Sequence, residues 1–345
     1  MYSNDLFKNF CKERNIRPST KKGYASALRL YESFNNNTID NLLKEAQIEE
    51  IEKIPLKDRK IKKRLIDFRN HLQKSSLSPN TSKTYFSKVK TFYMQHEVEL
   101  PRLPPVKYDK IYETNYLDLP TRKHIREALE ISDIGMKATI LFMASSGTAK
   151  AETLSMTISQ FIEATKEYHS KGSLESILNE LERKGNVVPT FYLKRIKTGK
   201  YYYTFCSAEA TSYIVKYLKT RDNLKPKDKL FDFTSSKLNL KFNRINDRMN
   251  WGRKGRYRFF RSHALRKFHA SNIGLGAEHI DALQGRSKSP VHEAYIKTNP
   301  QRLKEIYLRN MVNVMILEDK NQEIKKQEFN IIINVFLSGK EYNLI

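Results

Sequence analysis

The sequence predicts a mainly α-helical protein of two domains with one small β-hairpin, that is, an α+β chain of the mostly helical kind. Three observations lead to this prediction. Apolar residues recur at helical spacing through most of the chain, one stretch alone has strong β character, and a proline-rich segment interrupts the helical pattern near residue 105. With 345 residues, the chain is long enough for two domains.

The charge of the chain predicts a polyanionic partner. Lys and Arg number 63 against 38 Asp and Glu, which gives a formal net charge of +25. Nucleic acid is the commonest partner of so basic a protein, and an acidic membrane surface is the second. No apolar run approaches the roughly 20 residues of a membrane-spanning helix, and the N-terminus lacks the apolar segment of a signal peptide. We therefore expect a cytoplasmic protein that binds nucleic acid, with an acidic membrane surface as the alternative partner.

The cysteines disfavour two other classes of protein. Cys11 and Cys206 lie far apart and lack the spacing of metal ligands, so neither a disulfide scaffold nor a zinc site is expected. Both are predicted to be ordinary thiols, buried or half-buried. We expect no metal and no cofactor.

The first 100 residues predict a small domain of about four helices. Segments 17–34 and 78–96 resemble each other: each has a Ser/Thr cap region, a tyrosine four residues after a threonine, and then a helical apolar stripe. Single lysines usually lie on solvated faces. Here several cluster near helix starts, where backbone N–H groups also favour phosphate, so we expect them to contact the DNA backbone. They are Lys21, Lys22, Lys83, Lys88 and Lys90.

Residues 101–118 are predicted to be a linker, because three prolines at its start cannot continue a helix. A second domain should span 119–318, and its first helix should cover 119–132 with Thr121 at or beside the cap. An apolar helix over 136–147 should be buried and end at Gly147. Residues 319–345 should form a tail helix whose apolar end docks on its own domain or on a neighbouring subunit.

The middle of the second domain holds the β signal. Residues 163–184 are charged and predicted to be helical, whereas 187–207 contains two runs of β-branched and aromatic residues around a Lys-Thr-Gly-Lys turn, which predicts a hairpin. Helices should follow, separated by a loop over 251–262 that is rich in glycine and arginine. Its basic residues are predicted to contact the DNA backbone, although a solvated loop is the alternative. They are Arg253, Lys254, Arg256 and Arg258.

Residues 262–297 carry the candidate chemistry. His263 and Arg266 lie one helical turn apart, and Arg286 and Tyr295 follow across a Gly-Arg break. These are either surface polar residues or groups that surround a phosphate attacked by Tyr295. An arginine fork donates two parallel charge-assisted hydrogen bonds to phosphate. A tyrosine, whose free pKa is about 10, becomes a nucleophile only when a base or nearby positive charge activates it.

The spacing of these residues resembles that of the tyrosine recombinases, the phage-integrase family, in their archaeal or viral form. His263-Ala264-Leu265-Arg266 is similar to the family's H-x-x-R box, Gly285-Arg286 stands where Gly-His is usual, and Tyr295 follows at the offset of the nucleophile. Lys197 in the predicted hairpin resembles the family's hairpin lysine. Residues 142–156 resemble the box T-G-x-R-x-x-E-L. The resemblance covers residues 17 to about 310.

This resemblance implies a two-domain DNA-breaking-rejoining fold, with a helical SAM-like core-binding domain before the catalytic domain. It implies site-specific recombination through a 3′-phosphotyrosyl intermediate formed by Tyr295. Arg266 and Arg286 would neutralise the phosphate, His263 would act as base or donor, and Lys197 would protonate the 5′-oxygen. It further implies a homo-oligomer, from dimer to tetramer, that assembles on DNA and exchanges its C-terminal tails. Integration or excision of a virus or mobile element is the family's usual role.

The chain departs from the family pattern at two places. Glu152 matches the acidic position of the first box and should orient a neighbouring cation, which puts Ala149 where the first arginine belongs. Loss of one charge-stabilising donor costs on the order of 2–4 kcal/mol of transition-state stabilisation. The chain is therefore a slow enzyme, an enzyme that uses Lys150 as a substitute, or a DNA-binding protein that has lost catalysis. Arg286 in place of histidine keeps a positive charge. DNA relaxation of the type IB topoisomerase kind is a further alternative.

Other residues compete for the same roles. Tyr307 is a rival nucleophile, but its helical apolar setting predicts a core residue. His269, His279 and His292 are predicted to be structural or surface residues. Arg195 and Lys200 share the hairpin with Lys197 and are predicted to contact phosphate or solvent.

Overall fold

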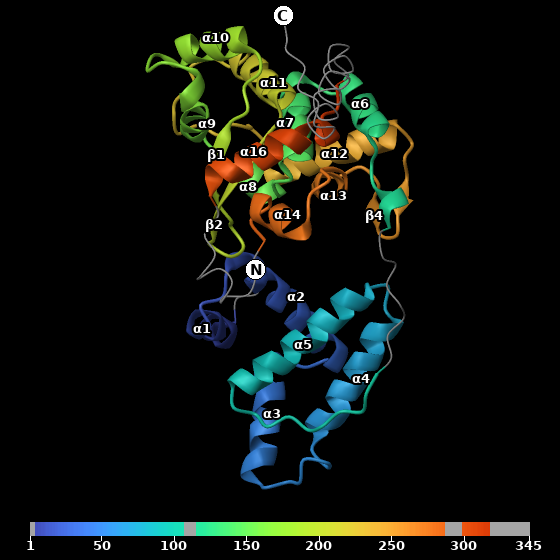
Figure 1. Ribbon diagram of the computed structural model, residues 1–345. Helices are drawn as coiled ribbons and strands as arrows, with labels where there is room; N and C mark the ends of the chain where they lie inside the picture. Colours follow the sequence, from blue (N-terminus) through green and yellow to red (C-terminus); the bar gives the residue numbers. More distant parts are fainter. Residues whose placement is uncertain (1–3, 107–114, 287–298, 318–345) are drawn as a thin grey trace, which may run out of the picture. The chain divides into compact units, whose positions relative to one another are not determined.

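The computed structural model describes residues 4–106, 115–286 and 299–317. The chain divides into two compact units, Met1–Tyr112 and Glu113–Ile345 (Figure 1). The division falls within 101–118, the range predicted to be a linker. As predicted, the described part of the chain is mostly helical, with a small amount of antiparallel β structure.

The first unit is all-helical in its described part. The two segments that resemble each other in sequence form α2 and α5, which pack against each other around a core rich in aromatic rings. Its helices are α1 (Asp5–Glu13), α2 (Pro18–Asn35), α3 (Ile39–Ile51), α4 (Lys60–Lys74) and α5 (Pro79–Gln95).

Both repeated helices begin in the same way and bury the stripe predicted from sequence. Each starts with a proline. Proline lacks a backbone N–H, but the N–H groups of a first helical turn have no acceptor within the helix, so no hydrogen bond is lost. In α5 the side chain of Ser78 also caps the helix by accepting from the backbone N–H of Thr81. The apolar stripes of α2 and α5 face each other, and there the hydroxyl of Tyr93 donates to that of Tyr31 at 3.3 Å.

The second unit surrounds a central buried helix. Its α-helices are α6 (Arg122–Glu130), α7 (Ile134–Ser146), α8 (Lys150–Ser155), α9 (Ile158–Ala164), α10 (Leu174–Lys184), α11 (Ala208–Lys219), α12 (Ser235–Arg248), α13 (Ser262–Asn272), α14 (Ala277–Leu283) and α16 (Pro300–Asn310). Single 3₁₀ turns occupy Tyr116–Asp118, Lys166–Tyr168 and Met311–Val314. Two antiparallel ribbons complete it: β1 (Thr190–Lys194) with β2 (Tyr201–Phe205), and β3 (Arg253–Lys254) with β4 (Tyr257–Arg258).

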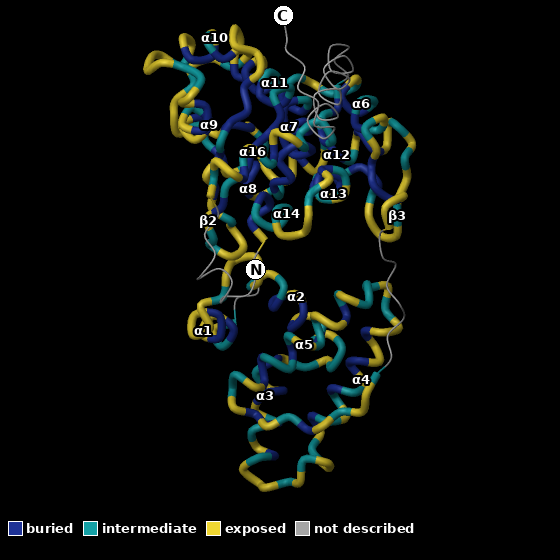
Figure 2. Tube along the Cα trace, in the orientation of Figure 1, coloured by how far each residue is buried: buried dark blue, intermediate teal, exposed yellow. Residues whose placement is uncertain are grey.

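Helix α7 is the centre of this unit. All of it except Ile134 and Lys137 is buried (Figure 2), because α11 and α13 both pack on it. Asp133 caps its start by accepting from the N–H of Met136. Gly147 ends it with a left-handed φ of 64°, which a residue with a Cβ adopts only at a cost. The predicted buried helix that stops at Gly147 is therefore confirmed.

The ribbon of β1 and β2 lies where the sequence predicts a hairpin. Phe191 and Leu193 are buried while Tyr192 and Lys194 are exposed, which is the period-two alternation of a strand with one covered face. The turn closes through two backbone hydrogen bonds, from Arg195 N–H to the Lys200 carbonyl and from Gly199 N–H to the Arg195 carbonyl, both of 2.7 Å.

Two local predictions are wrong. Residues 163–184 are not one helix: a 3₁₀ turn and a loop precede α10, because Ser173 caps a new helix start and Gly172 adjoins it. Residues 251–262 are not simply a loop. They contain β3 and β4, and Gly252 and Gly255 supply the positive φ angles, 65° and 57°, that this tight ribbon requires. Cys11 and Cys206 are free and buried, as predicted.

Candidate active site

Arg266, on α13, is a buried cation held by two backbone carbonyls. Its Nη1 donates to the Gly147 carbonyl at 2.6 Å and its Nη2 to the Gln284 carbonyl at 2.9 Å. These oxygens come from the ends of α7 and α14, where helices leave carbonyl groups without intrahelical partners. The partial negative charge at both helix ends favours the guanidinium. Two helix ends thus fix the orientation of the side chain.

Gln284, His269 and Gly147 pack closely around the backbone of Arg266. The side-chain nitrogen Nε2 of Gln284 donates to the Arg266 carbonyl at 3.2 Å and lies 3.0 Å from Nδ1 of His269. A Cβ at Gly147 would come within 2.5 Å of that Nδ1, so only glycine fits there. His269 is fully buried, and burial together with the charge of nearby arginines lowers its pKa to about 3. Its imidazole is therefore neutral.

Glu152 and Arg195 form a second buried pair. Glu152 lies in the first turn of α8 and is 2% exposed; its Oε2 is 2.8 Å from Nη1 of Arg195, whose side chain is 16% exposed. The other carboxylate oxygen, Oε1, accepts from the backbone N–H of Ile196 at 2.9 Å. The carboxylate therefore anchors the start of the hairpin turn to α8.

The hairpin also closes against the end of α14. Gly285 has a φ of 60°, and a Cβ there would meet the ring of Tyr202 at 2.5 Å, so this strand residue packs directly on the glycine. Lys200 donates to the Arg286 carbonyl at 3.3 Å. Nη1 of Arg286 lies 3.4 Å from Oδ1 of Asp281, and the side chain stays 45% exposed. Arg286 is thus the accessible cation of the group.

The arginines of this region repel one another. Burial, and after it the positive charges of Arg195 and Arg286, together lower the pKa of Arg266 to about 10. The imidazole of His263, on α13, keeps accessible surface. Partial desolvation and then the charges of the surrounding arginines and Lys267 nevertheless hold its pKa below the ordinary value. Such a cluster favours an anion, and its forks suit the oxygens of a phosphate.

Tyr202 adds a buried hydroxyl that has no hydrogen-bond partner in the described part of the chain. Burial raises the pKa of this phenol, and the neighbouring carboxylate of Glu152 raises it further, while Arg266 and Arg195 oppose the shift. The phenol is therefore protonated and able to donate.

Comparisons with known proteins bear on the fold. No protein-family model matches the chain, and no curated protein matches it. Among solved structures, the XerH site-specific recombinase bound to its difH substrate matches with a TM-score of 0.50 and 15% sequence identity, over 88% of this chain and 83% of that chain. The Tn1549 transposon integrase in complex with transposon right end DNA matches with a TM-score of 0.51 and 14% identity, over 88% of this chain and 98% of the integrase chain. The chain has the tyrosine recombinase fold.

The tyrosine recombinase fold brings together residues from separate motifs. Glu152 from the first box, Arg266 from the H-x-x-R box and Arg286 from Gly-Arg share one region with the hairpin. Lys197 is exposed in the hairpin turn. Lys150 points to α12, where its Nζ donates to Oδ1 of Asn239 at 3.0 Å. Tyr295 lies outside the described residues, as does His292.

Tyr307, the rival nucleophile, is a core residue as the sequence predicts. It is fully buried on α16, and its hydroxyl donates to the Ser145 carbonyl at 3.0 Å. Burial raises the pKa of its phenol well above the ordinary value. A phenol so enclosed reaches no substrate. His279 is half-buried on α14, in keeping with a structural or surface role.

The predicted DNA-contacting lysines of the first unit have two settings. Lys22 and Lys83 are exposed. The other three are half-buried over aromatic rings: Lys21 lies 6.0 Å from the centroid of Phe7, Lys88 5.4 Å from Tyr24, and Lys90 5.8 Å from Phe86. In each case the ammonium nitrogen lies over the ring face, which is a cation–π arrangement, and partial burial lowers the pKa of Lys88.

The basic ribbon of the second unit is partly ion-paired. Arg258 makes a two-pronged contact with Asp247, at 2.8 and 2.9 Å. Nζ of Lys254 lies 3.7 Å from Oδ1 of Asp118. Arg253 and Arg256 are exposed, and Arg253 donates to the Arg256 carbonyl at 2.9 Å. The ribbon is therefore shaped by its own charges, and Arg253 and Arg256 are its accessible cations.

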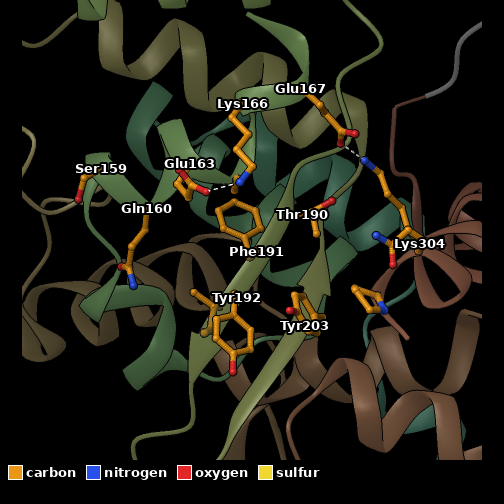
Figure 3. A pocket seen from close by; sticks show the side chains of 14 residues that line it. Ser159, Gln160, Glu163, Lys166, Glu167, Thr190, Phe191, Tyr192, Tyr203 and Lys304 are labelled. Atoms are coloured by element: carbon orange, nitrogen blue, oxygen red, sulfur yellow. Dashed lines mark hydrogen bonds and ion pairs between the residues drawn. The ribbon is translucent and has the colours of Figure 1, made fainter. Parts of the chain in front are cut away.

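A separate cavity of about 700 Å³ lies beside α9, β1 and α16 (Figure 3). Glu163 pairs with Lys166 in its wall, and Lys304 reaches Glu167. Tyr192 and Tyr203 line it as well, but none of the clustered arginines does.

Within the described residues, no group of three His, Cys, Asp or Glu side chains is placed to hold a metal ion. No helix in those same ranges is long and apolar enough to cross a membrane.

Sequence reasoning missed two members of the site, Gln284 and Tyr202, because no motif reveals them. Arg195 was predicted to contact phosphate or solvent, and its pairing with Glu152 was not expected, although strand alternation places it on the same side as buried Phe191 and Leu193. That alternation was the available signal.

Proposed function

We propose that this protein is a site-specific DNA recombinase that cleaves and rejoins DNA through a 3′-phosphotyrosyl intermediate. The observation that carries the proposal is the convergence of Arg266, Arg286 and Arg195 from three distant segments, each held in place by carbonyl or carboxylate groups. The tyrosine recombinase fold supports it. So does the presence of DNA in the two similar structures, the XerH and Tn1549 complexes.

In the proposed reaction, Tyr295 attacks the scissile phosphate. Its phenolic oxygen forms a bond to phosphorus, and the bond from phosphorus to the 5′-oxygen breaks. His263 takes the phenolic proton, in keeping with a lowered pKa that leaves the imidazole neutral near pH 7. Lys197 gives a proton to the departing 5′-oxygen. Attack by a 5′-hydroxyl reverses every step, so the strand is rejoined without loss of atoms.

The cations lower the barrier because negative charge builds on the phosphate oxygens in the transition state. Arg266 is already oriented by two carbonyls, so it needs no reorganisation when the charge develops. Arg286 is accessible and meets the phosphate from the α14 side. Side-chain cations of this kind stabilise the transition state electrostatically.

The remaining roles follow from the same proposal. The first unit would act as the core-binding domain, with the second as the catalytic domain. Protomers would assemble on double-stranded DNA as a dimer to tetramer, with the C-terminal tail as the exchanged segment. Integration or excision of a mobile or viral element is the corresponding biological role.

A covalent trapping experiment tests the proposal. Duplexes that the full-length protein selects by binding from a random library are prepared with a nick, so that a short fragment diffuses away after cleavage and the adduct accumulates. We expect a covalent protein–DNA product that survives denaturation. Tyr295→Phe should abolish it, since the variant lacks the attacking hydroxyl, and Tyr307→Phe should retain it.

Other outcomes select the alternatives. An adduct lost only in Tyr307→Phe would reassign the nucleophile. Salt-sensitive binding without any adduct would identify a DNA-binding protein that has lost catalysis, which Ala149 makes a specific alternative. Relaxation of supercoiled plasmid by a monomer, with no strand exchange, would favour a topoisomerase-like activity.

A further inference from the structure

Position 149 lacks the group that its motif calls for. Ala149 is the N-cap of α8, and its methyl group has no donor for a phosphate. The adjacent cation, Lys150, is engaged with Asn239 of α12. If the site transfers strands as proposed above, a guanidinium must reach this place from elsewhere or the site works without it.

Arg195 is the guanidinium that reaches α8. Phe191 and Leu193 are buried on the inner face of β1, and Arg195 continues the same alternation one residue beyond the strand, while Lys194 between them is exposed. The inner orientation brings its Nη1 to 2.8 Å from the carboxylate of Glu152. The neighbouring N–H of Ile196 binds the other carboxylate oxygen, so the backbone is fixed as well.

This contact puts Arg195 within reach of the vacant motif position. Ala149 is the N-cap of α8 and Glu152 is its third residue, the two positions whose side chains face each other in a capping box. A guanidinium held on Glu152 therefore lies beside the place that a side chain from 149 would occupy. It also lies close to Arg266, since its charge is the largest electrostatic contribution that lowers the pKa of Arg266 after burial.

We propose that Arg195 replaces the missing first-box arginine and binds the scissile phosphate together with Arg266, with Glu152 as its positioning residue. The proposal deepens the recombinase function and rests on it for the identity of the phosphate. A guanidinium has five N–H donors, so an ion pair with one carboxylate leaves donors for a phosphate oxygen. The chain thus carries the clamp on its hairpin, two residues before Lys197.

A purely structural role is the competing explanation. Arg195 could serve only to neutralise Glu152, a buried carboxylate whose charge needs a partner. Both roles predict that Arg195→Ala slows cleavage, so activity alone does not separate them. Removing the charge of the phosphate separates the two roles, because only a direct contact between Arg195 and the phosphate depends on that charge.

The first measurement is the rate of covalent trapping on a nicked selected duplex. We expect Arg195→Ala to slow adduct formation about 10²–10³-fold, the usual effect of losing one charge-stabilising donor. Arg195→Lys should restore part of the rate, and Ala149→Arg in the Arg195→Ala background should restore more. Arg183→Ala is the matched control: Arg183 is exposed on α10, and its loss should leave the rate unchanged. A rate for Arg195→Ala within twofold of wild type overturns the proposal.

The second measurement replaces the scissile phosphate with a neutral methylphosphonate. Removal of the phosphate charge should shrink the difference between wild type and Arg195→Ala to less than tenfold, since the clamp has less charge to neutralise. An undiminished difference would show that Arg195 acts only by holding Glu152. Wild-type-like thermal unfolding of Arg195→Ala excludes misfolding as the cause of slow trapping.

A third measurement keeps the proposal testable when no cleavage occurs. Methylphosphonates are placed one at a time along the selected duplex, and binding is measured for Tyr295→Phe with and without Arg195→Ala. We expect one phosphate whose neutralisation weakens binding about tenfold only when Arg195 is present. Absence of any such position overturns the Arg195 assignment, whereas absence of an adduct with wild type overturns the recombinase function.

Discussion

At the scale of single residues, the second unit buries a charged side chain whose donors are met by main-chain carbonyls. Arg266 is enclosed, yet two carbonyls at helix ends meet its donors. Burial of a charge without such partners costs several kcal/mol. The H-x-x-R spacing identifies Arg266 in the sequence, but its partners Gly147 and Gln284 belong to distant segments, so only the folded chain reveals them.

His269 should make the stability of the protein depend on pH. Its pKa is about 3 in the folded state and about 6.5 in an unfolded chain, so the unfolded state binds more protons between these values. The contribution of His269 to the free energy of unfolding is therefore fully present above pH 6.5 and falls as the pH drops below it. The loss is about 1.4 kcal/mol per pH unit where the imidazole is protonated in the unfolded chain and neutral in the folded one. Urea unfolding at intervals from pH 7 to pH 5 measures the slope.

The variant His269→Gln isolates this contribution. The other titratable groups are common to both proteins. We expect the variant to be less stable at pH 7 and to show a flatter slope below pH 6.5. Equal slopes for the two proteins would show that His269 titrates in the folded state as it does in the unfolded chain.

At the scale of elements, sequence patterns predict local structure well and end points less well. An apolar run and Gly147 predict α7, and aromatic and β-branched residues predict the hairpin. The break between α9 and α10 was missed because the charged residues on both sides keep a helical pattern. The ribbon of β3 and β4 was missed because each strand has only two residues, too few for an alternation to show.

The junction between β2 and α14 gives a test at this scale. Gly285→Ala forces a Cβ into a left-handed backbone and against the ring of Tyr202, so we expect a loss of about 2–4 kcal/mol in the free energy of unfolding. Gly199→Ala is the matched control, because Gly199 has φ 78° but open space around it. It should cost about 1 kcal/mol, from backbone strain alone. Denaturant unfolding of both variants compares the two, and similar losses would contradict the close packing.

At the scale of the whole molecule, composition predicts the partner class and motif order predicts the fold, whereas the assembled site needs the structure. A net charge of +25 is visible in the sequence. The sequence does not show which cation lies beside Glu152, because Lys150 is nearer along the chain while Arg195 is nearer in space. Long-range pairing of this kind depends on how a strand and a helix meet.

Binding to duplex DNA should weaken steeply with salt. Neutralising six to ten phosphates releases their counterions, so the affinity should fall by about 10³–10⁵ between 50 and 200 mM salt. Lys22→Ala and Lys83→Ala, at exposed positions in α2 and α5, should each reduce the slope of log K against log salt by about 0.9. Lys216→Ala, exposed on α11, serves as the control and should leave the slope unchanged. Titrations at four salt concentrations measure it, and equal slopes for all proteins would exclude those lysines from the interface.

The six-residue turn after β1 has a consequence for regulation. Arg195 and Lys197 both lie within it, and the carboxylate of Glu152 attaches it to α8 through the Arg195 side chain and the Ile196 amide. Withdrawal of that one ribbon would remove the proposed clamp and the proposed proton donor in the same movement. If the chain is the recombinase proposed above, both groups would therefore enter or leave the active site together.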